Sequence, residues 1–227
     1  MGGAGSRARA TERSGPPESG APLEERRFRQ VGDAAGRPGA APGDRTHPPL
    51  ARVVVVGATG SGKSTFAQRL AVRLGAEYVE LDELFWDAHW TEAAPDVFRA
   101  RVERATAGPR WVVAGNYGRV RDLLWPQADT IVWLDYAFPL VLRRLTVRTV
   151  RRAVTGEVLW NGNREYFLEH CRLWSQKSLF HWLFKTYWAY RRELPVLFAQ
   201  PAHAHLRIAR LLRPREAEAW LAGRAPE

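Results

Sequence analysis

Residues 53–65 read VVVVGATGSGKST, and this stretch determines the fold of the chain. Val53 to Val56 form a short continuous run of β-branched residues, which is typical of a strand buried on both faces of a parallel sheet. The next eight residues match G-x-x-x-x-G-K-[ST], and apolar residues at helical spacing follow from Phe66 to Leu74. The order of strand, glycine-rich loop and helix predicts a phosphate-binding loop.

Each residue type in this loop has a chemical reason. Glycines let backbone N–H groups turn toward a polyphosphate, and the following helix adds unpaired N–H groups and the positive end of its dipole. Lys63 is expected to reach the β- and γ-phosphates of ATP, and Ser64 to offer its hydroxyl to Mg²⁺. The predicted nucleotide-binding residues of the loop are Gly57, Thr59, Gly60, Ser61, Gly62, Lys63, Ser64 and Thr65.

The composition indicates one intracellular domain behind a tail. The chain has 227 residues, enough for one α/β domain, and its single cysteine, Cys171, excludes an internal disulfide. It has neither an apolar run long enough to span a membrane nor a secretory signal, so we expect a cytoplasmic protein. Residues 1–49 nearly lack large apolar side chains, which predicts a disordered tail before a domain at 50–227.

Positive charge is concentrated in one segment. Of the net charge of +10, most comes from residues 140–192, which hold eleven Lys or Arg against three Asp or Glu. Within this segment Arg144, Arg148 and Arg152 share a helix face, where like charges repel one another unless an anion lies nearby. A solvated basic face is the alternative. Because the loop supplies an anionic partner, we favour a lid that binds the ligand.

Polar residues follow the other predicted strands, at the edge where ligands bind in open parallel sheets. Asp82 follows a strand at 77–81 and is predicted either to take the proton of an acceptor hydroxyl or to cap a turn. Arg119 follows a strand at 111–114 and is predicted to bind the acceptor, with a solvent-exposed role as the alternative. Asp135 ends the next strand, where it either supports Mg²⁺ or caps the following helix.

The remaining elements complete an α/β pattern. Helices are expected at 95–107, 138–154 and 165–192, and a terminal helix at 214–221 follows a fifth strand at 204–211. The helix at 165–192 is rich in aromatic residues, and we interpret it as core or lid packing. Attachment to a membrane surface is the alternative.

Several motifs together resemble one known family. They are GATGSGKST, VELDELFW, WVVAGNY, DTIVWLDY, TGEVLWNGNRE and LRPREAEAW. These segments resemble the adenylate-kinase-like P-loop proteins called DNA topology modulation proteins. The resemblance implies a three-layer α/β fold like that of nucleoside monophosphate kinases, with a five-stranded parallel sheet of order 2-3-1-4-5 and a helical lid. It also implies that Arg148 and Arg152 act in catalysis from the lid and that Arg215 borders the adenine.

One position departs from this resemblance. The third strand of these proteins usually ends in an Asp that supports Mg²⁺, whereas this chain has Ala114 there. A methyl group does not hold metal-bound water, so we expect the outer shell of Mg²⁺ to come from Asp82, Asp135 or solvent. Nucleotide binding is expected to survive this change, and phosphoryl transfer to be weaker.

The sequence therefore predicts a kinase that uses Mg-ATP. The γ-phosphoryl group is expected to pass to an unidentified small-molecule or nucleotide acceptor, with Lys63 and Asp82 as catalytic residues. Two alternatives stay open. One is a nucleotide-binding regulator with weak catalysis, and the other is a nucleic-acid-binding protein that uses the basic segment 140–192.

Overall fold

In the computed structural model of this protein, the structure describes residues 50–155, 161 and 179–224. Three sequence predictions lie outside the described residues: the disordered tail at 1–49, the placement of Cys171, and the first part of the aromatic helix at 165–192. The domain boundary at residue 50 therefore stays a prediction.

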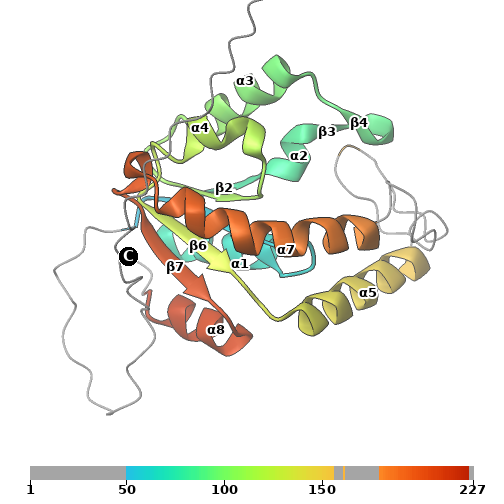
Figure 1. Cartoon of the computed structure of the whole chain (residues 1–227). Coiled ribbons are helices and arrows are strands. Elements are labelled where there is room, and N and C mark those ends of the chain that lie inside the picture. The colour runs from blue at the N-terminus through green and yellow to red at the C-terminus, as the bar shows by residue number, and fades with distance from the viewer. Residues whose placement is uncertain (1–49, 156–160, 162–178, 225–227) are drawn as a thin grey trace, which may run out of the picture.

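A five-stranded parallel sheet forms the centre of the fold (Figure 1). Its strands are β1 (Arg52–Gly57), β2 (Glu77–Glu80), β5 (Trp111–Ala114), β6 (Thr130–Leu134) and β7 (Arg207–Leu211). Their spatial order is β2-β5-β1-β6-β7, and every neighbouring pair runs parallel. In chain order within this sheet that is 2-3-1-4-5, so the predicted topology is confirmed.

The central strands are continuous apolar runs. The strands β5 and β6 are buried at every position, and β1 is buried from Val53 to Gly57. A strand covered by helices on both faces needs apolar side chains at consecutive positions instead of alternate ones. For this reason, short runs of consecutive apolar residues in the sequence predicted where these strands lie.

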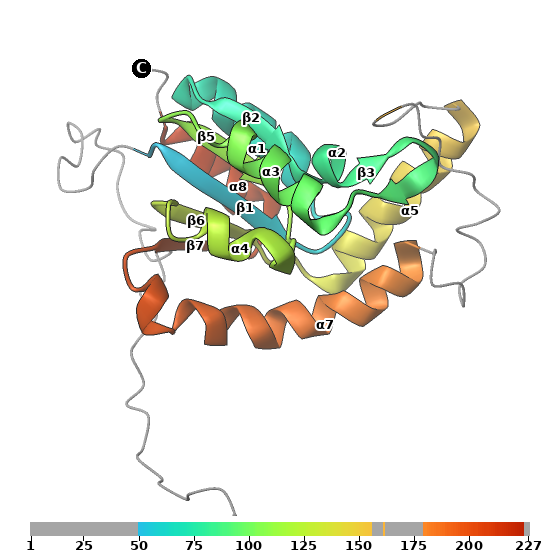
Figure 2. The ribbon, with the colours of Figure 1, turned by 90° about the horizontal axis from the view of Figure 1, so that it is seen from above.

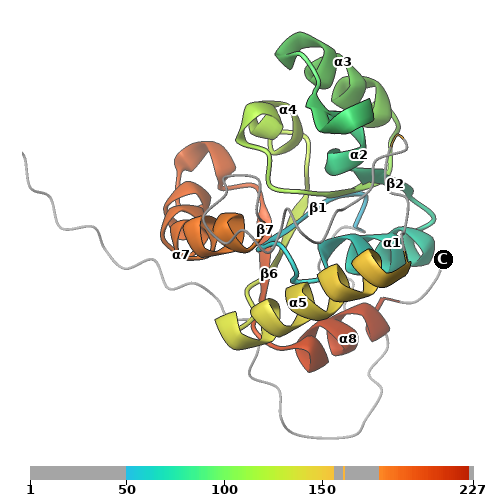
Figure 3. The same cartoon turned by 90° about the vertical axis from the view of Figure 1, so that its right-hand side faces the viewer.

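Helices cover both faces of the sheet (Figure 3). They are α1 (Lys63–Leu74), α2 (Leu81–Phe85), α3 (Pro95–Ala105), α4 (Arg121–Leu124), α5 (Phe138–Thr155), α7 (Leu179–Phe198) and α8 (Pro214–Ala222). One core joins α1, α5 and α8 to one face of the sheet, and a second joins α3 and α4 to the other. Among the described helices, none combines the length and hydropathy that crossing a lipid bilayer requires.

The long helix α7 runs along the side of the domain and takes part in both cores (Figure 2). Its Leu183 packs in the core of α5, and its Leu194 packs in the core of α4. The helix continues to Phe198, beyond the predicted end at residue 192, and passes through Pro195. Pro195 has no N–H to donate, but Leu194 and Phe198 are buried on either side of it, and their packing outweighs the lost hydrogen bond.

A small unit between β2 and α3 was not predicted. After β2 the chain forms α2 and then a two-stranded antiparallel pair, β3 (Trp86–Asp87) and β4 (Thr91–Glu92). Strands of two residues are too short to show a periodicity, so sequence patterns do not reveal them. This unit follows α2, which begins directly after the carboxyl end of β2.

Candidate functional site

The phosphate loop leaves the sheet at Gly57 and enters α1 at Lys63. Gly60 and Gly62 have φ values of 81° and 91°, in the left-handed region that glycine adopts without strain. Gly62 is also the residue that precedes the first turn of α1. The unpaired N–H groups of that turn therefore open onto the loop, which is the arrangement that binds phosphate at a helix start.

Lys63 folds back across this loop. Its Nζ donates a hydrogen bond of 3.2 Å to the carbonyl oxygen of Ala58. Burial lowers the pKa of Lys63, and the nearby carboxylates of Asp82 and Glu80 oppose that shift. The ammonium group thus lies between the loop and two acidic side chains.

Glu80 is a site residue that the sequence analysis missed. It ends β2 and is only 6% exposed, although β2 is the edge strand of the sheet. The hydroxyl group of Tyr78 donates a hydrogen bond to its carboxylate, and the hydroxyl group of Ser64 lies close to the same carboxylate. Ser64 is the loop residue expected to bind Mg²⁺. The carboxylate of Glu80 therefore lies close to the expected Mg²⁺ position.

The register of the sheet explains how Glu80 relates to Ala114. Ala114 is paired with Val55 on one side and with Glu80 on the other. Paired residues of neighbouring parallel strands point to the same face of a sheet. The carboxylate that the third strand lacks is therefore present one strand away, on the face that bears α1.

The donor set around Ser64 fits Mg²⁺. A hydroxyl oxygen backed by one carboxylate is what this ion takes from a protein when it also binds nucleotide phosphates. Among the described residues, no group of three or more His, Cys, Asp or Glu is arranged as an independent metal site. Binding of the ion is therefore expected to depend on the nucleotide.

The environment of Glu80 predicts a pH-dependent stability. Burial raises the pKa of Glu80 above its ordinary value of 4.5, with Ser64, Tyr78 and Lys63 lowering it and Asp82 raising it further. Between the unfolded and the folded pKa the native state binds more protons, so stability falls as the pH rises through that window. We expect Glu80→Gln to remove this fall. Its melting temperature relative to wild type should increase from pH 4 toward neutral pH, and a constant difference would contradict the assignment.

Asp82 is held by a tyrosine from the neighbouring strand end. It lies in the first turn of α2, and its Oδ1 accepts a hydrogen bond of 2.7 Å from the hydroxyl of Tyr117. The Tyr117 ring packs against Phe85 and Phe98, with centroids 4.7 and 5.2 Å away. Burial raises the pKa of Tyr117, so its hydroxyl stays a donor and fixes the carboxylate in place.

Asn116 ties the loop to β5. Its Nδ2 donates to the carbonyl of Gly57 at 2.6 Å, and the N–H of Gly57 donates back to its Oδ1 at 3.0 Å. Tyr190 of α7 lies close to the same amide: burial raises the pKa of Tyr190, and Asn116 opposes that shift. The Gly-Asn-Tyr segment after β5 thus positions both the phosphate loop and Asp82.

Asp135 does not play the predicted role as a ligand of the Mg²⁺ shell. Its carboxylate is buried, with Oδ1 2.5 Å from Nε of Arg191 and Oδ2 2.5 Å from Nη2 of Arg210. Both oxygens are engaged by guanidinium groups, which exclude a cation from the same position. Asp135 instead joins α7 to β7.

Arg119 also lies away from its predicted place. Its Nη1 is 3.3 Å from the carboxylate of Glu92, and its side chain is 56% exposed. It forms a surface ion pair, because the turn at Gly118–Val120 directs it toward the β3–β4 unit. The arginine two residues later, Arg121, lines a cleft whose wall also includes Tyr117.

The predicted lid arginines lie along α5. Arg144 reaches the loop directly, since its Nη1 donates to the carbonyl of Ser61 at 3.1 Å. Arg148 follows one turn later, close enough to help lower the pKa of Lys63. Arg152 is half-buried further along the helix, and Arg215 is exposed at the start of α8. The resemblance singled out Arg148 and Arg152, and the basic helix face in the sequence also includes Arg144, which hydrogen-bonds to the loop.

The sheet order and the phosphate loop together define the P-loop kinase fold, in the variant seen in nucleoside monophosphate kinases. No protein-family model matches the chain. A shikimate kinase from Synechococcus elongatus is 28% identical over an alignment of 137 residues, and the match covers 51% of this chain and 72% of that protein.

Two solved structures are similar over most of the chain. A gluconokinase from Sinorhizobium meliloti is 20% identical and is matched over 78% of this chain and 94% of its own, with a TM-score of 0.43. A shikimate kinase from Acinetobacter baumannii is 19% identical, over 77% and 90%, with a TM-score of 0.45.

Proposed function

We propose that this protein is a kinase that transfers the γ-phosphoryl group of ATP to a small molecule. The observation that carries the proposal is the phosphate loop with Lys63 folded against it, together with Asp82 near enough for its charge to oppose the lowering of the Lys63 pKa by burial. A phosphate cradle and a positioned carboxylate are the two parts that phosphoryl transfer needs. The sequence similarity to shikimate kinase supports the same activity class.

The residues of the site suggest how the reaction proceeds. The backbone of the loop and Lys63 bind the phosphates of ATP, and Arg144 and Arg148 add positive charge where charge develops. The acceptor hydroxyl attacks the γ-phosphorus and its proton passes to Asp82. As the new O–P bond forms, the bond from the γ-phosphorus to the bridging oxygen breaks and ADP leaves. Tyr117 occupies Oδ1 of Asp82, which leaves Oδ2 for the proton.

Ser64 and Glu80 are the residues that would hold Mg²⁺. When bound, this ion neutralises charge on the β- and γ-phosphates. Glu80, whose carboxylate lies close to Ser64, would orient the water bound to the ion, and it would supply the acidic group that position 114 lacks. This arrangement favours an active kinase over a weakly catalytic regulator.

That this chain belongs with the DNA topology modulation proteins remains a hypothesis. It assigns no acceptor, and the basic face of α5 that would bind nucleic acid includes Arg144, which contacts the phosphate loop. We therefore assign these arginines to the nucleotide.

The proposal is tested by incubating the protein with ATP labelled at the γ-phosphate, Mg²⁺ and a panel of acceptors. The panel holds shikimate, gluconate, other sugar acids, polyols and nucleoside monophosphates. We expect a labelled phosphate ester from one class of acceptor, and no product without Mg²⁺. ATP binding with no labelled ester from any acceptor would support the regulator, and salt-dependent binding of DNA without ATP would support the nucleic-acid-binding alternative.

A further inference from the structure

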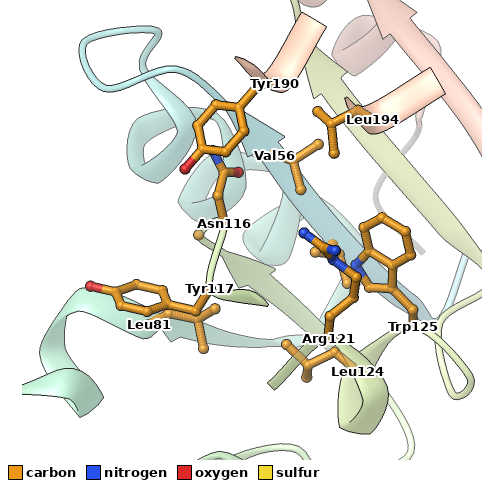
Figure 4. Close-up of a pocket in the computed structure, with 11 residues that line it drawn as sticks. Val56, Leu81, Asn116, Tyr117, Arg121, Leu124, Trp125, Tyr190 and Leu194 are labelled. Carbon is orange, nitrogen blue, oxygen red and sulfur yellow. The ribbon is translucent and has the colours of Figure 1, made fainter. Parts of the chain in front are cut away.

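A cleft opens beside the Gly-Asn-Tyr segment, between β1, α4 and α7 (Figure 4). Its interior cavity has a volume of about 20 Å³, and the space in front of this cavity is open to solvent. Most of its wall is apolar and comes from Val56, Leu81, Leu124, Trp125 and Leu194. A small-molecule site typically has such a wall, with a few polar groups that fix the orientation of the ligand.

The polar groups of the cleft face one another. The Arg121 guanidinium lies against the Trp125 ring, with its central carbon 4.9 Å from the ring centroid. Asn116 and Tyr190 lie close to each other, across the open space from it (Figure 4). The cleft therefore offers one cation at one end and two neutral hydrogen-bonding side chains at the other.

Arg121 has no carboxylate partner in the part of the chain that the structure describes. The adjacent carboxylate, Asp122, is taken by Arg99, whose Nη1 and Nη2 lie 2.9 and 2.8 Å from its two oxygens. Two other arginines of this side of the domain are also paired, Arg101 with Asp87 and Arg119 with Glu92. A half-buried guanidinium without a counter-ion, beside an open cleft, is suited to an anionic ligand.

The wall of the cleft adjoins the reacting groups. Tyr117 lines the cleft and donates its hydroxyl to Asp82. Asn116 lines it too and holds Gly57 at the start of the phosphate loop. Asp82 and the phosphate loop do not line the cleft themselves, so a ligand with one end at Arg121 would reach them past Asn116 and Tyr117.

We propose that this cleft binds the acceptor and that Arg121 holds a carboxylate of that acceptor, so that the substrate is a small hydroxy acid. The inference rests on the proposed kinase function and specifies its substrate class. A single guanidinium matches the charge and the two oxygens of one carboxylate, and the apolar wall excludes a highly charged acceptor. A phosphate monoester carries nearly twice that charge and finds no second cation among the lining residues.

The test measures binding by calorimetry in the presence of a non-hydrolysable ATP analogue. The probes are two matched sets: glycerate, glycerol and glycerol 3-phosphate, and xylonate, xylitol and xylitol 5-phosphate. We expect the hydroxy acid of at least one set to bind wild type more tightly than its neutral and phosphorylated counterparts. Arg121→Ala should weaken that binding by about tenfold to a hundredfold, as expected for the loss of charge-assisted hydrogen bonds.

Two further variants make the result specific. Arg121→Lys keeps a positive charge over Trp125 but loses the planar fork, so it should retain the fold and part of the affinity. Arg104→Ala removes an exposed arginine of the neighbouring helix α3 and should bind the acid as wild type does. A melting curve of each variant separates loss of the ligand contact from loss of the fold.

Three outcomes would overturn the proposal: no hydroxy acid binds wild type, a neutral or phosphorylated probe binds better than its acid, or Arg121→Ala and Arg121→Lys bind the acid unchanged. Affinity for the ATP analogue is measured separately. If wild type does not bind the analogue, the kinase function fails. If it binds the analogue but no acid depends on Arg121, only the acceptor assignment fails.

Discussion

Lys63→Ala is expected to lower the rate of phosphoryl transfer by about a hundredfold to a thousandfold, the loss typical of removing one group that stabilises developing charge. In the structure the ammonium lies against the loop, 3.2 Å from the carbonyl of Ala58, and between the charges of Glu80 and Asp82. Its removal takes away the only lysine of the loop and weakens ATP binding as well. Single-turnover consumption of labelled ATP and a calorimetric titration measure the two effects.

The fold is expected to tolerate this change. Burial lowers the pKa of Lys63, so its charge is held at some cost to the folded state. The Ala58 carbonyl also keeps its hydrogen bond of 3.1 Å from the N–H of Ser61. Lys185→Ala, on an exposed face of α7, is the matched control and should leave turnover and nucleotide affinity unchanged. Normal turnover by Lys63→Ala would exclude this loop as the catalytic phosphate site.

Glu80→Gln is expected to lower Mg²⁺-dependent turnover by about tenfold to a hundredfold, the loss typical of removing a residue that orients a metal's ligands. The amide keeps the shape of the side chain but not its charge beside Ser64. Nucleotide affinity without Mg²⁺ should change little, because the loop backbone and Lys63 make those contacts. The measurements are kcat and the Mg²⁺ concentration that gives half of it.

A second substitution tests whether a carboxylate at position 114 of β5 can replace the carboxylate at position 80 of β2. Ala114 lies beside Glu80 in the sheet, so Ala114→Asp in the Glu80→Gln background returns an acid to the same face of the site. We expect this double variant to recover much of the lost turnover. Ala114→Asp alone should bring no gain, because two adjacent carboxylates repel each other. A double variant as slow as Glu80→Gln would show that position 114 does not substitute for position 80.

The sequence predicted the sheet well because its determinants are local. The run at Val53 to Val56, the loop glycines and the apolar strand at 130–134 each reflect the burial of a few consecutive residues. The phosphate loop was predictable for the same reason, since all of its groups lie within one short segment.

The remaining parts of the site depend on which distant segments meet. Glu80 gained its role only when β2 was paired with β5, which places it beside Ala114 and behind Ser64. Asp135 does not fit its predicted role because its carboxylate accepts hydrogen bonds from Arg191 and Arg210, which are 56 and 75 residues away in the chain. No pattern around either residue encodes these partners, so a carboxylate at a strand end was equally compatible with both outcomes.

The two hydrogen bonds between Asn116 and Gly57 also affect the entropy of ligand binding. One side-chain amide imitates the backbone pairing of a neighbouring strand and extends the ladder of the sheet into the first residue of the loop. That residue is therefore ordered by the sheet before any nucleotide arrives. A preorganised loop loses less conformational freedom on binding, so more of the interaction energy with the phosphates is expressed as affinity.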